Sequence, residues 1–237
     1  LDAVRSRKRG DTARDWGLKL RADRRDLAAK AWRVAVEYCR SADDDVLGRH
    51  VPDDVQRADA DFCGRYGPQC GALRPFLARW AKKLWAAASD PDRSDLACTQ
   101  EVMAKKALLR LRSRPDETMA WGGGSAAAPP HVLFVDEAQD LDDCALAIIE
   151  CQRSRGPTTC VLVGDPAQAI YLFRGASDKS LRDTKVSGHA DEAFELRRSF
   201  RFGPAIAREA NRMLSVKAHY DRTFRFEPVV GCGPPDG

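Results

Sequence analysis

The sequence lacks the long apolar segments that membrane insertion and secretion require. None of its apolar runs reaches the ~18–20 residues of a membrane helix, and its N-terminus has no apolar signal-peptide core. The 237 residues are 43% hydrophobic and 31% charged, which is typical of a folded globular protein and argues against global disorder. We therefore expect an intracellular protein without membrane contacts, large enough to bury a substantial core.

The eight cysteines lack the spacing of a disulfide scaffold or of a zinc site. No Cys-x-x-Cys pair is present, and the four histidines are scattered along the chain. A zinc site built from His50, Cys63 and Cys70 departs from the usual ligand spacing and is therefore disfavoured. We expect reduced, buried thiols, as in intracellular proteins.

Charge is unevenly distributed, although the formal net charge is only +4. Residues 1–33 are rich in lysine and arginine, whereas residues 136–150 are acidic. This separation suits a protein that holds phosphates in one place and a divalent metal in another. Charge runs are more often solvated helix faces, so the distribution alone leaves both interpretations open.

The first 112 residues have the apolar periodicity of helices. We predict helices over residues 12–40, 73–88 and 100–112, where apolar residues recur about every 3.6 positions. The second of these carries an apolar stripe that consists of Leu73, Leu77, Trp80, Leu84 and Ala88. Trp80 and Trp85 could form a base-stacking platform, but aromatic residues at helical spacing usually belong to a core. The pattern predicts a small all-helical subdomain over residues 1–112.

The pattern changes after a low-complexity stretch. Residues 113–130 include Gly-Gly-Gly-Ser and Pro-Pro, which sustain neither helix nor strand, so we expect a flexible insertion there. Short apolar runs then alternate with helical segments, which predicts strands at 131–135, 159–163 and 194–196 and helices at 144–151 and 204–214. This alternation predicts an α/β fold with a doubly wound parallel sheet, followed by a tail over residues 231–237.

Two carboxylates follow the first apolar run, in the motif Val-Asp-Glu-Ala-Gln-Asp at 135–140. In a parallel α/β fold, Asp136 and Glu137 would lie at the carboxyl edge of the sheet, where such folds bind their ligands. Nucleotide hydrolysis needs one carboxylate for Mg²⁺ and one beside the γ-phosphate to orient a water. A capping loop with acidic residues at a helix N-terminus explains the motif equally well when it is taken alone.

The second motif, Val-Gly-Asp-Pro-Ala-Gln-Ala-Ile-Tyr-Leu-Phe-Arg-Gly-Ala at 163–176, again begins at a strand end. Gln168 can hydrogen-bond a phosphate oxygen without adding charge, as a sensor of that phosphate must. Tyr171, Phe173 and Arg174 combine rings with a cation, a mixture that suits unpaired bases and backbone phosphate. The alternative is that the rings lie in the core and Arg174 forms an ion pair.

The third motif, Leu-Arg-Arg-Ser-Phe-Arg-Phe-Gly at 196–203, leads from an expected strand into an expected helix. Arginines immediately before a helix N-terminus suit phosphate binding. An arginine that reaches a γ-phosphate there would neutralise the charge that develops during phosphoryl transfer.

In their order and separation, the three motifs resemble motifs II, III and IV of the UvrD/Rep helicases of superfamily 1. The sequence Ser-Phe-Arg-Phe-Gly and the stretches at 39–52, 81–91 and 99–109 resemble the F-box DNA helicase branch of that superfamily. The likeness covers roughly residues 31–230 and is strongest over 131–215. It implies an incomplete RecA-like motor domain and an ATP-dependent DNA helicase, moving 3′ to 5′ and acting in DNA repair or recombination.

The resemblance also implies a role for each matching residue. Asp136 would hold Mg²⁺, and Glu137 would be the catalytic base. Gln168 would sense the γ-phosphate of ATP, and Arg201 would be the arginine finger. The residues that would contact single-stranded or partly duplex DNA are Tyr171, Phe173 and Arg174. The helical residues 1–112 would form the subdomain inserted into the first motor domain.

A phosphate-binding loop is missing from the sequence, because none of its seventeen glycines is followed by lysine. The helicase motifs beyond motif IV and an F-box are missing too, and the first residue is Leu1, so we expect a fragment of a longer protein. That protein would be nuclear if it is eukaryotic, and linked to a ubiquitin ligase only if an F-box precedes this chain. Two alternatives stay open: the motor subunit of a recombination helicase-nuclease, and a non-catalytic DNA-binding remnant.

Overall fold

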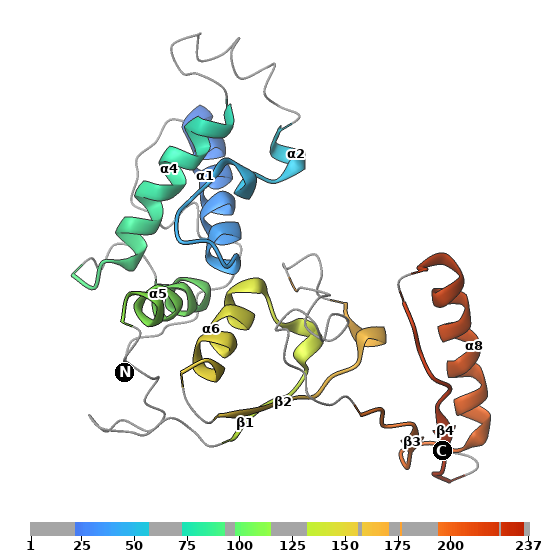
Figure 1. Ribbon diagram of the computed structural model, residues 1–237. Helices are drawn as coiled ribbons and strands as arrows, with labels where there is room; N and C mark the ends of the chain where they lie inside the picture. Colours follow the sequence, from blue (N-terminus) through green and yellow to red (C-terminus); the bar gives the residue numbers. More distant parts are fainter. Residues whose placement is uncertain are drawn as a thin grey trace.

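The computed structural model describes residues 22–56, 73–92, 98–114, 132–155, 158–170, 176, 194–222 and 224–234. Helices come first along these ranges, a two-stranded sheet with one helix follows, and a long helix with two short strands comes last (Figure 1). No helix within the described ranges is both long and apolar enough to cross a membrane.

Three helices form the core of the first part: α1 (Ala22–Arg40), α4 (Leu73–Ser89) and α5 (Gln100–Ser113). Two short elements, η1 (Gly48–His50) and α2 (Asp53–Gln56), lie between α1 and α4 in the chain and were not predicted. The predicted helices at 73–88 and 100–112 are confirmed. The helix predicted from residue 12 ends at Arg40 as expected, and its first residues lie outside the described ranges.

The buried stripe of α4 differs from the predicted one at a single position. Its buried residues are Leu73, Leu77, Ala81, Leu84 and Ala88. Trp80, predicted to lie in the core, is 46% exposed. The buried face continues from Leu77 to Ala81, four residues further on, rather than to Trp80, three residues further on. Trp85 packs against this core as expected, and its ring meets the Tyr38 ring edge-on at 5.5 Å between centroids.

A buried lysine connects α5 to the end of α1. Lys105 is fully buried, and its Nζ donates to the Ser41 carbonyl at 2.8 Å and to the Asp43 carbonyl. The same ammonium lies 4.2 Å from the centroid of the Tyr38 ring. Burial lowers the pKa of Lys105. Carbonyls beyond a helix C-terminus suit a cation, so this contact stabilises the packing of α5 on α1.

The cysteines only partly match the prediction of buried thiols. Cys39 and Cys144 are buried, and burial raises the pKa of their thiols to about 12 and about 11 respectively. Cys98 and Cys232 are exposed instead, because they lie in loop segments, one before α5 and one after the short strand β4 (Val230–Gly231), rather than in a core.

His50 has both ring nitrogens engaged by protein groups. Its Nδ1 accepts the Leu47 backbone N–H at 2.9 Å, and its Nε2 lies 2.7 Å from Asp43 Oδ2. Burial lowers the pKa of His50. The Arg49 guanidinium pairs with Asp43 and, together with His50, lowers the pKa of that carboxyl group. The other members of the disfavoured zinc set, Cys63 and Cys70, lie outside the described residues.

This arrangement predicts that acid destabilises the fold through His50. Because its pKa is lowered in the folded state, the unfolded chain takes up the proton first as the pH falls below the ordinary value of 6.5. Denaturant unfolding between about pH 8 and about pH 5 should show stability declining through this window. A His50→Gln variant should lose that slope, whereas His219→Gln, which changes an exposed histidine of the helix after motif IV, should keep it. An unchanged slope in His50→Gln would contradict the assignment.

The α/β part begins with two parallel strands, β1 (Val132–Val135) and β2 (Thr159–Leu162), joined through α6 (Asp143–Arg153). Asp142 caps α6, since its Oδ1 accepts the Ala145 N–H at 2.8 Å. The predicted strands at 131–135 and 159–163 and the helix at 144–151 are confirmed to within two residues. The strand–helix–strand order is the parallel unit that the alternating pattern predicted.

The expectation that these strands are buried is wrong for several of their side chains. Phe134 is 73% exposed, and Val132, Leu162 and Val163 are exposed as well. Each sheet of the described residues has two strands, and α6 covers one face of the β1–β2 pair (Figure 1). Strands become buried on both faces only when helices cover both. The structure is compatible with an α/β fold, and it does not confirm the doubly wound sheet.

The last part consists of β3 (Arg198–Ser199), α8 (Pro204–Tyr220) and β4 (Val230–Gly231), with β3 parallel to β4. The strand predicted at 194–196 is wrong: Phe194 and Leu196 are exposed, and the strand begins at Arg198, two residues after the predicted one ends. The helix predicted at 204–214 is present and extends to Tyr220. A Cβ at Gly231 would collide with the backbone of Gly203, so this close approach requires glycine.

Candidate nucleotide-hydrolysis site

The two predicted carboxylates lie directly after β1. Asp136 Oδ1 accepts the Glu137 N–H at 2.9 Å, and both side chains are exposed. The Ala138 N–H donates to the Val163 carbonyl at 2.9 Å, and the Val163 N–H donates to the Val135 carbonyl at 2.8 Å. The backbone pairing of β1 and β2 therefore continues past the strands and brings their carboxyl ends together.

Glu137 has an unusual backbone conformation. Its φ of 51° and ψ of 41° lie in the left-handed region, and it is the one such non-glycine residue in the described chain. Such a conformation costs about 1–2 kcal/mol for an ordinary residue. The left-handed conformation occurs between the end of β1 and the short helix η3 (Ala138–Asp140). The first N–H of η3 donates to the Val163 carbonyl, directly after β2. Backbone strain of this kind is concentrated at functional sites.

The side-chain amide of Gln139 connects the two strand ends. Its Nε2 donates to Glu137 Oε2 at 2.6 Å, and its Oε1 accepts the Asp165 backbone N–H at 3.0 Å. Gln139 itself is 3% exposed. The sequence motifs indicated no role for this residue. The signal that could have found it was a glutamine in a short buried turn, where a polar side chain must find partners.

The loop after β2 presents Gln168 at the same edge of the sheet. Asp165 caps the short helix η4 (Pro166–Gln168), because its Oδ1 accepts the Ala167 N–H at 2.8 Å. Its Oδ2 accepts a hydrogen bond from Gln168 Nε2 at 2.9 Å. The exposed Gln168 amide is thus oriented by the residue whose own N–H is bound by Gln139.

Arg201 lies in the turn between β3 and α8, and it is exposed. Its backbone N–H donates to Ser199 Oγ at 3.3 Å. Within the described ranges, no ion pair joins its guanidinium to Asp136 or Glu137. The structure therefore brings the two strand-end loops together and does not pair Arg201 with the described carboxylates of the site.

One side chain of α8 does contact the loop after β2. Lys217 Nζ donates to the Pro166 carbonyl at 3.2 Å and to the Ala167 carbonyl at 3.4 Å. The ammonium also lies 4.4 Å from the centroid of the Phe224 ring. The helix that follows Arg201 is therefore connected to the loop that carries Gln168.

The predicted DNA-contacting residues Tyr171, Phe173 and Arg174 lie outside the described residues. The nearest described residues on either side are Ile170, which is exposed, and Ala176, which pairs with Asp142 at the beginning of α6.

The donor set at the end of β1 suits Mg²⁺ rather than a metal held by protein alone. Among the described residues, no group of three or more histidine, cysteine or acidic side chains could hold a metal ion. Mg²⁺ is usually bound through one or two carboxylates together with waters and substrate phosphates. Asp136 and Glu137 provide carboxylates of that kind, both open to solvent.

The two glutamines of the site offer a matched test of the Gln139 contacts. Gln139→Met removes a buried amide with two partners, so we expect a loss of about 1–3 kcal/mol in the free energy of unfolding. Amide exchange at Asp165 should accelerate in the same variant. Gln168→Met removes an exposed amide and should change stability by less than about 0.5 kcal/mol. Equal effects of the two substitutions, measured by denaturant unfolding, would show that the Gln139 contacts contribute nothing.

Comparison with known proteins gives a family-model match and several similar proteins. Residues 124–187 match the family model of the UvrD/REP helicase N-terminal domain. The chain is 38% identical to F-box DNA helicase protein 1 of Schizosaccharomyces pombe over 141 residues, which is 60% of this chain and 14% of that protein. It is 43% identical to F-box DNA helicase 1 of Gallus gallus over 86 residues, covering 35% of this chain and 7% of that protein.

A third relative is RecBCD enzyme subunit RecB of Escherichia coli, 32% identical over 126 residues, or 52% of this chain and 10% of that protein. The chain thus matches between 7% and 14% of the length of these relatives. No solved structure matches. The segment that holds Asp136, Glu137 and Gln168 therefore matches the UvrD/REP helicase N-terminal domain, as the resemblance of the motifs predicted.

Proposed function

We propose that this chain is the nucleotide-hydrolysis part of an ATP-dependent DNA helicase that moves 3′ to 5′ along single-stranded DNA in repair or recombination. The observation that carries the proposal is the Gln139 amide, which holds the Glu137 carboxylate and the backbone of the Gln168 loop at one sheet edge. A hydrolysis site needs a water-orienting carboxylate and a phosphate-sensing group side by side.

Each residue has a distinct task in the proposed reaction. Asp136 would hold Mg²⁺, which neutralises charge on the phosphates of ATP when it is bound. Glu137 would orient the attacking water and accept its proton. Gln168 would hydrogen-bond the γ-phosphate, and Arg201 would approach that phosphate when the parts of the motor close, stabilising its developing charge.

The proposed function implies a division of the chain into parts of a helicase motor. Residues 1–112 would be the helical subdomain inserted into the first motor domain, with a flexible insertion over 113–130. Residues 131–230 would hold the end of the first motor domain and the start of the second, with a tail over 231–237. The Lys217 contact with the loop after β2 supports communication between the two motor domains.

DNA is the proposed partner, single-stranded or partly duplex. Tyr171 and Phe173 would stack on bases, and Arg174 would contact backbone phosphate. In a eukaryote a DNA partner would make the protein nuclear, and a ubiquitin ligase would be a partner only if the longer protein carries an F-box.

The similarity to RecB supports a second candidate, the motor subunit of a recombination helicase-nuclease. A nuclease domain in the same longer protein would favour it. A non-catalytic DNA-binding remnant is the third candidate, and it differs from the other two in having no ATP turnover at all.

Turnover measurements test the proposal directly. The chain alone should hydrolyse ATP no faster than background, because no Gly-Lys-Ser/Thr loop holds the phosphates in line. In a longer gene product that includes such a loop, Glu137→Gln should retain nucleotide binding and lower DNA-stimulated turnover about 10²–10⁴-fold. Arg201→Ala should lower it about 10³–10⁵-fold.

Either variant with near-normal turnover would contradict the role given to that residue. A longer product that binds DNA and never hydrolyses ATP would favour the non-catalytic remnant.

A further inference from the structure

An open pocket of about 370 Å³ lies beside the C-terminal end of α8, and neither strand-end carboxylate lines it. The residues that line it are Ala218, Arg222, Phe224, Arg225 and Phe226. Its volume is at the small end of the range for ligand pockets, ~300–1,000 Å³, and suits a single small unit rather than a long ligand. Neither the motifs nor the proposed hydrolysis reaction uses any of these residues.

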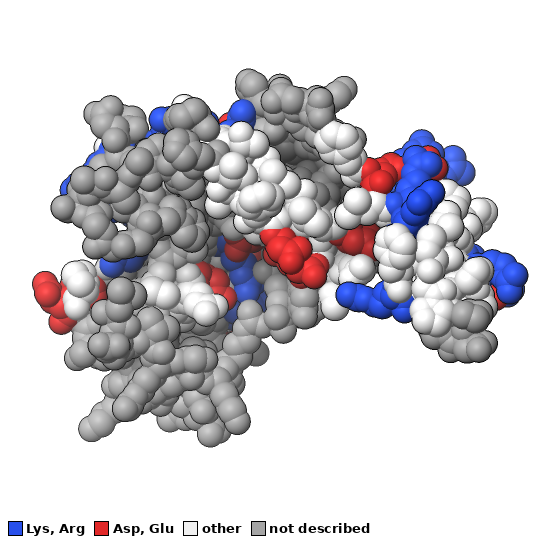
Figure 2. Space-filling model, turned by 90° about the horizontal axis from the view of Figure 1, so that it is seen from below, with Lys and Arg blue, Asp and Glu red and all other residues white. Residues whose placement is uncertain are grey.

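The two arginines of this pocket have no acidic partner. Arg222 and Arg225 are exposed, and neither guanidinium forms an ion pair within the described ranges. Arg197 in the same part of the chain differs, because it pairs with Glu195 and Glu227. Lys and Arg side chains gather at the end of the molecule that carries α8, while acidic side chains lie nearer the middle of this face (Figure 2). Unpaired guanidinium groups suit phosphate, which they bind through two parallel hydrogen bonds.

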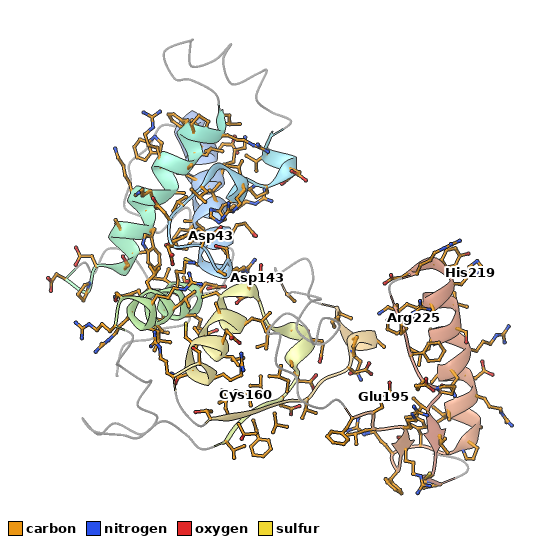
Figure 3. The ribbon with its side chains drawn as sticks, viewed as in Figure 1. Asp43, Asp143, Cys160, Glu195, His219 and Arg225 are labelled. Carbon is orange, nitrogen blue, oxygen red and sulfur yellow. The ribbon has the colours of Figure 1, made fainter. Side chains whose placement is uncertain are left out.

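Two phenyl rings form the apolar side of the pocket. Phe224 is 3% exposed, and the ring of Phe226 is stacked on it with centroids 6.1 Å apart and planes 16° apart. Phe226 is only half-buried and lines the pocket. Arg225 lies on the side of α8 that faces the rest of the described chain, and His219 lies on the far side (Figure 3). A supported ring beside unpaired cations is the combination on which an unpaired base stacks while its phosphate is neutralised.

We propose that this pocket binds one nucleotide of a DNA single strand, with the phosphate on Arg222 and Arg225 and the base on Phe226. The proposal rests on DNA as the partner of the proposed function, and it adds a contact outside the Tyr171–Arg174 segment. A single strand fits better than a duplex, because a paired base does not expose its face to a ring in a pocket.

Lys217 connects this pocket to the loop of the γ-phosphate sensor. Its ammonium lies over Phe224, the ring beneath Phe226, and donates to the Pro166 and Ala167 carbonyls. Two side chains, Phe224 and Lys217, thus connect a strand held on Phe226 to the loop that carries Gln168. A shift of that loop on nucleotide hydrolysis reaches the strand contact through this lysine.

The test uses this chain and a short fluorescent oligodeoxythymidine, with binding followed by anisotropy at several salt concentrations. Changing both Arg222 and Arg225 to serine should weaken binding and reduce the slope of log K against log salt by about 0.7, because the pocket neutralises one phosphate of a single strand. The matched control changes Arg208 and Arg212 to serine, two exposed arginines of α8 outside the pocket. The control pair should have a smaller effect on both affinity and slope.

The ring is tested separately from the charge. Phe226→Ala should weaken binding about 5- to 150-fold, which is the worth of one stacked base, and should leave the salt slope unchanged. Phe226→Leu retains apolar volume without a flat ring, so it should show the same loss even if Phe226→Ala fails to fold by circular dichroism.

The outcomes separate this pocket from the proposed DNA-binding motif. If Tyr171→Ala with Phe173→Ala abolishes binding and the pocket variants bind normally, the pocket proposal is overturned and the motif assignment stands. If the pocket variants lose binding and the Tyr171/Phe173 variant does not, the pocket is supported and the motif assignment is wrong. Equal losses in the Arg208/Arg212 control, or no binding by the unmodified chain, overturn the pocket proposal.

Discussion

The hydrogen bonds of the Gln139 side-chain amide join the two loops that follow β1 and β2. One end of the amide holds the Glu137 carboxylate, and the other end holds the Asp165 backbone N–H in the loop after β2. The backbone of Glu137 is in the left-handed region, which ordinary residues avoid. Contacts with the surrounding structure must therefore hold this residue in place. The amide is buried, so losing either partner has a cost that an exposed glutamine would not have.

The same contacts continue toward α8. Asp165, which Gln139 binds, caps η4 and orients the Gln168 amide. The carbonyls of η4 are bound in turn by Lys217, whose ammonium lies over the Phe224 ring. Gln168, the proposed phosphate sensor, and the pocket proposed to bind a DNA strand are therefore joined through short, direct contacts. Such a connection is what a motor needs if hydrolysis at one site is to change the grip at another.

Helices at 73–89 and 100–113 and the strands β1 and β2 could be predicted because local apolar patterns determine them. The exposure of Trp80 and Phe134 could not, since it depends on which other elements cover each face. The strand predicted at 194–196 was wrong because apolar residues also occur at the surface. Asp136, Glu137 and Gln168 were predicted as a set from their motifs. Gln139 was missed because its role lies in a contact between segments far apart in sequence.

Turnover in a double-mutant cycle tests the central claim, that Gln139 positions Glu137, most directly. In a longer gene product that hydrolyses ATP, Gln139→Met should slow turnover when Glu137 is present and add almost nothing in the Glu137→Gln background, because both changes remove one function. Nucleotide affinity should be similar in all four proteins. If the two losses add independently, Gln139 does not act through Glu137 and the account of this site is wrong.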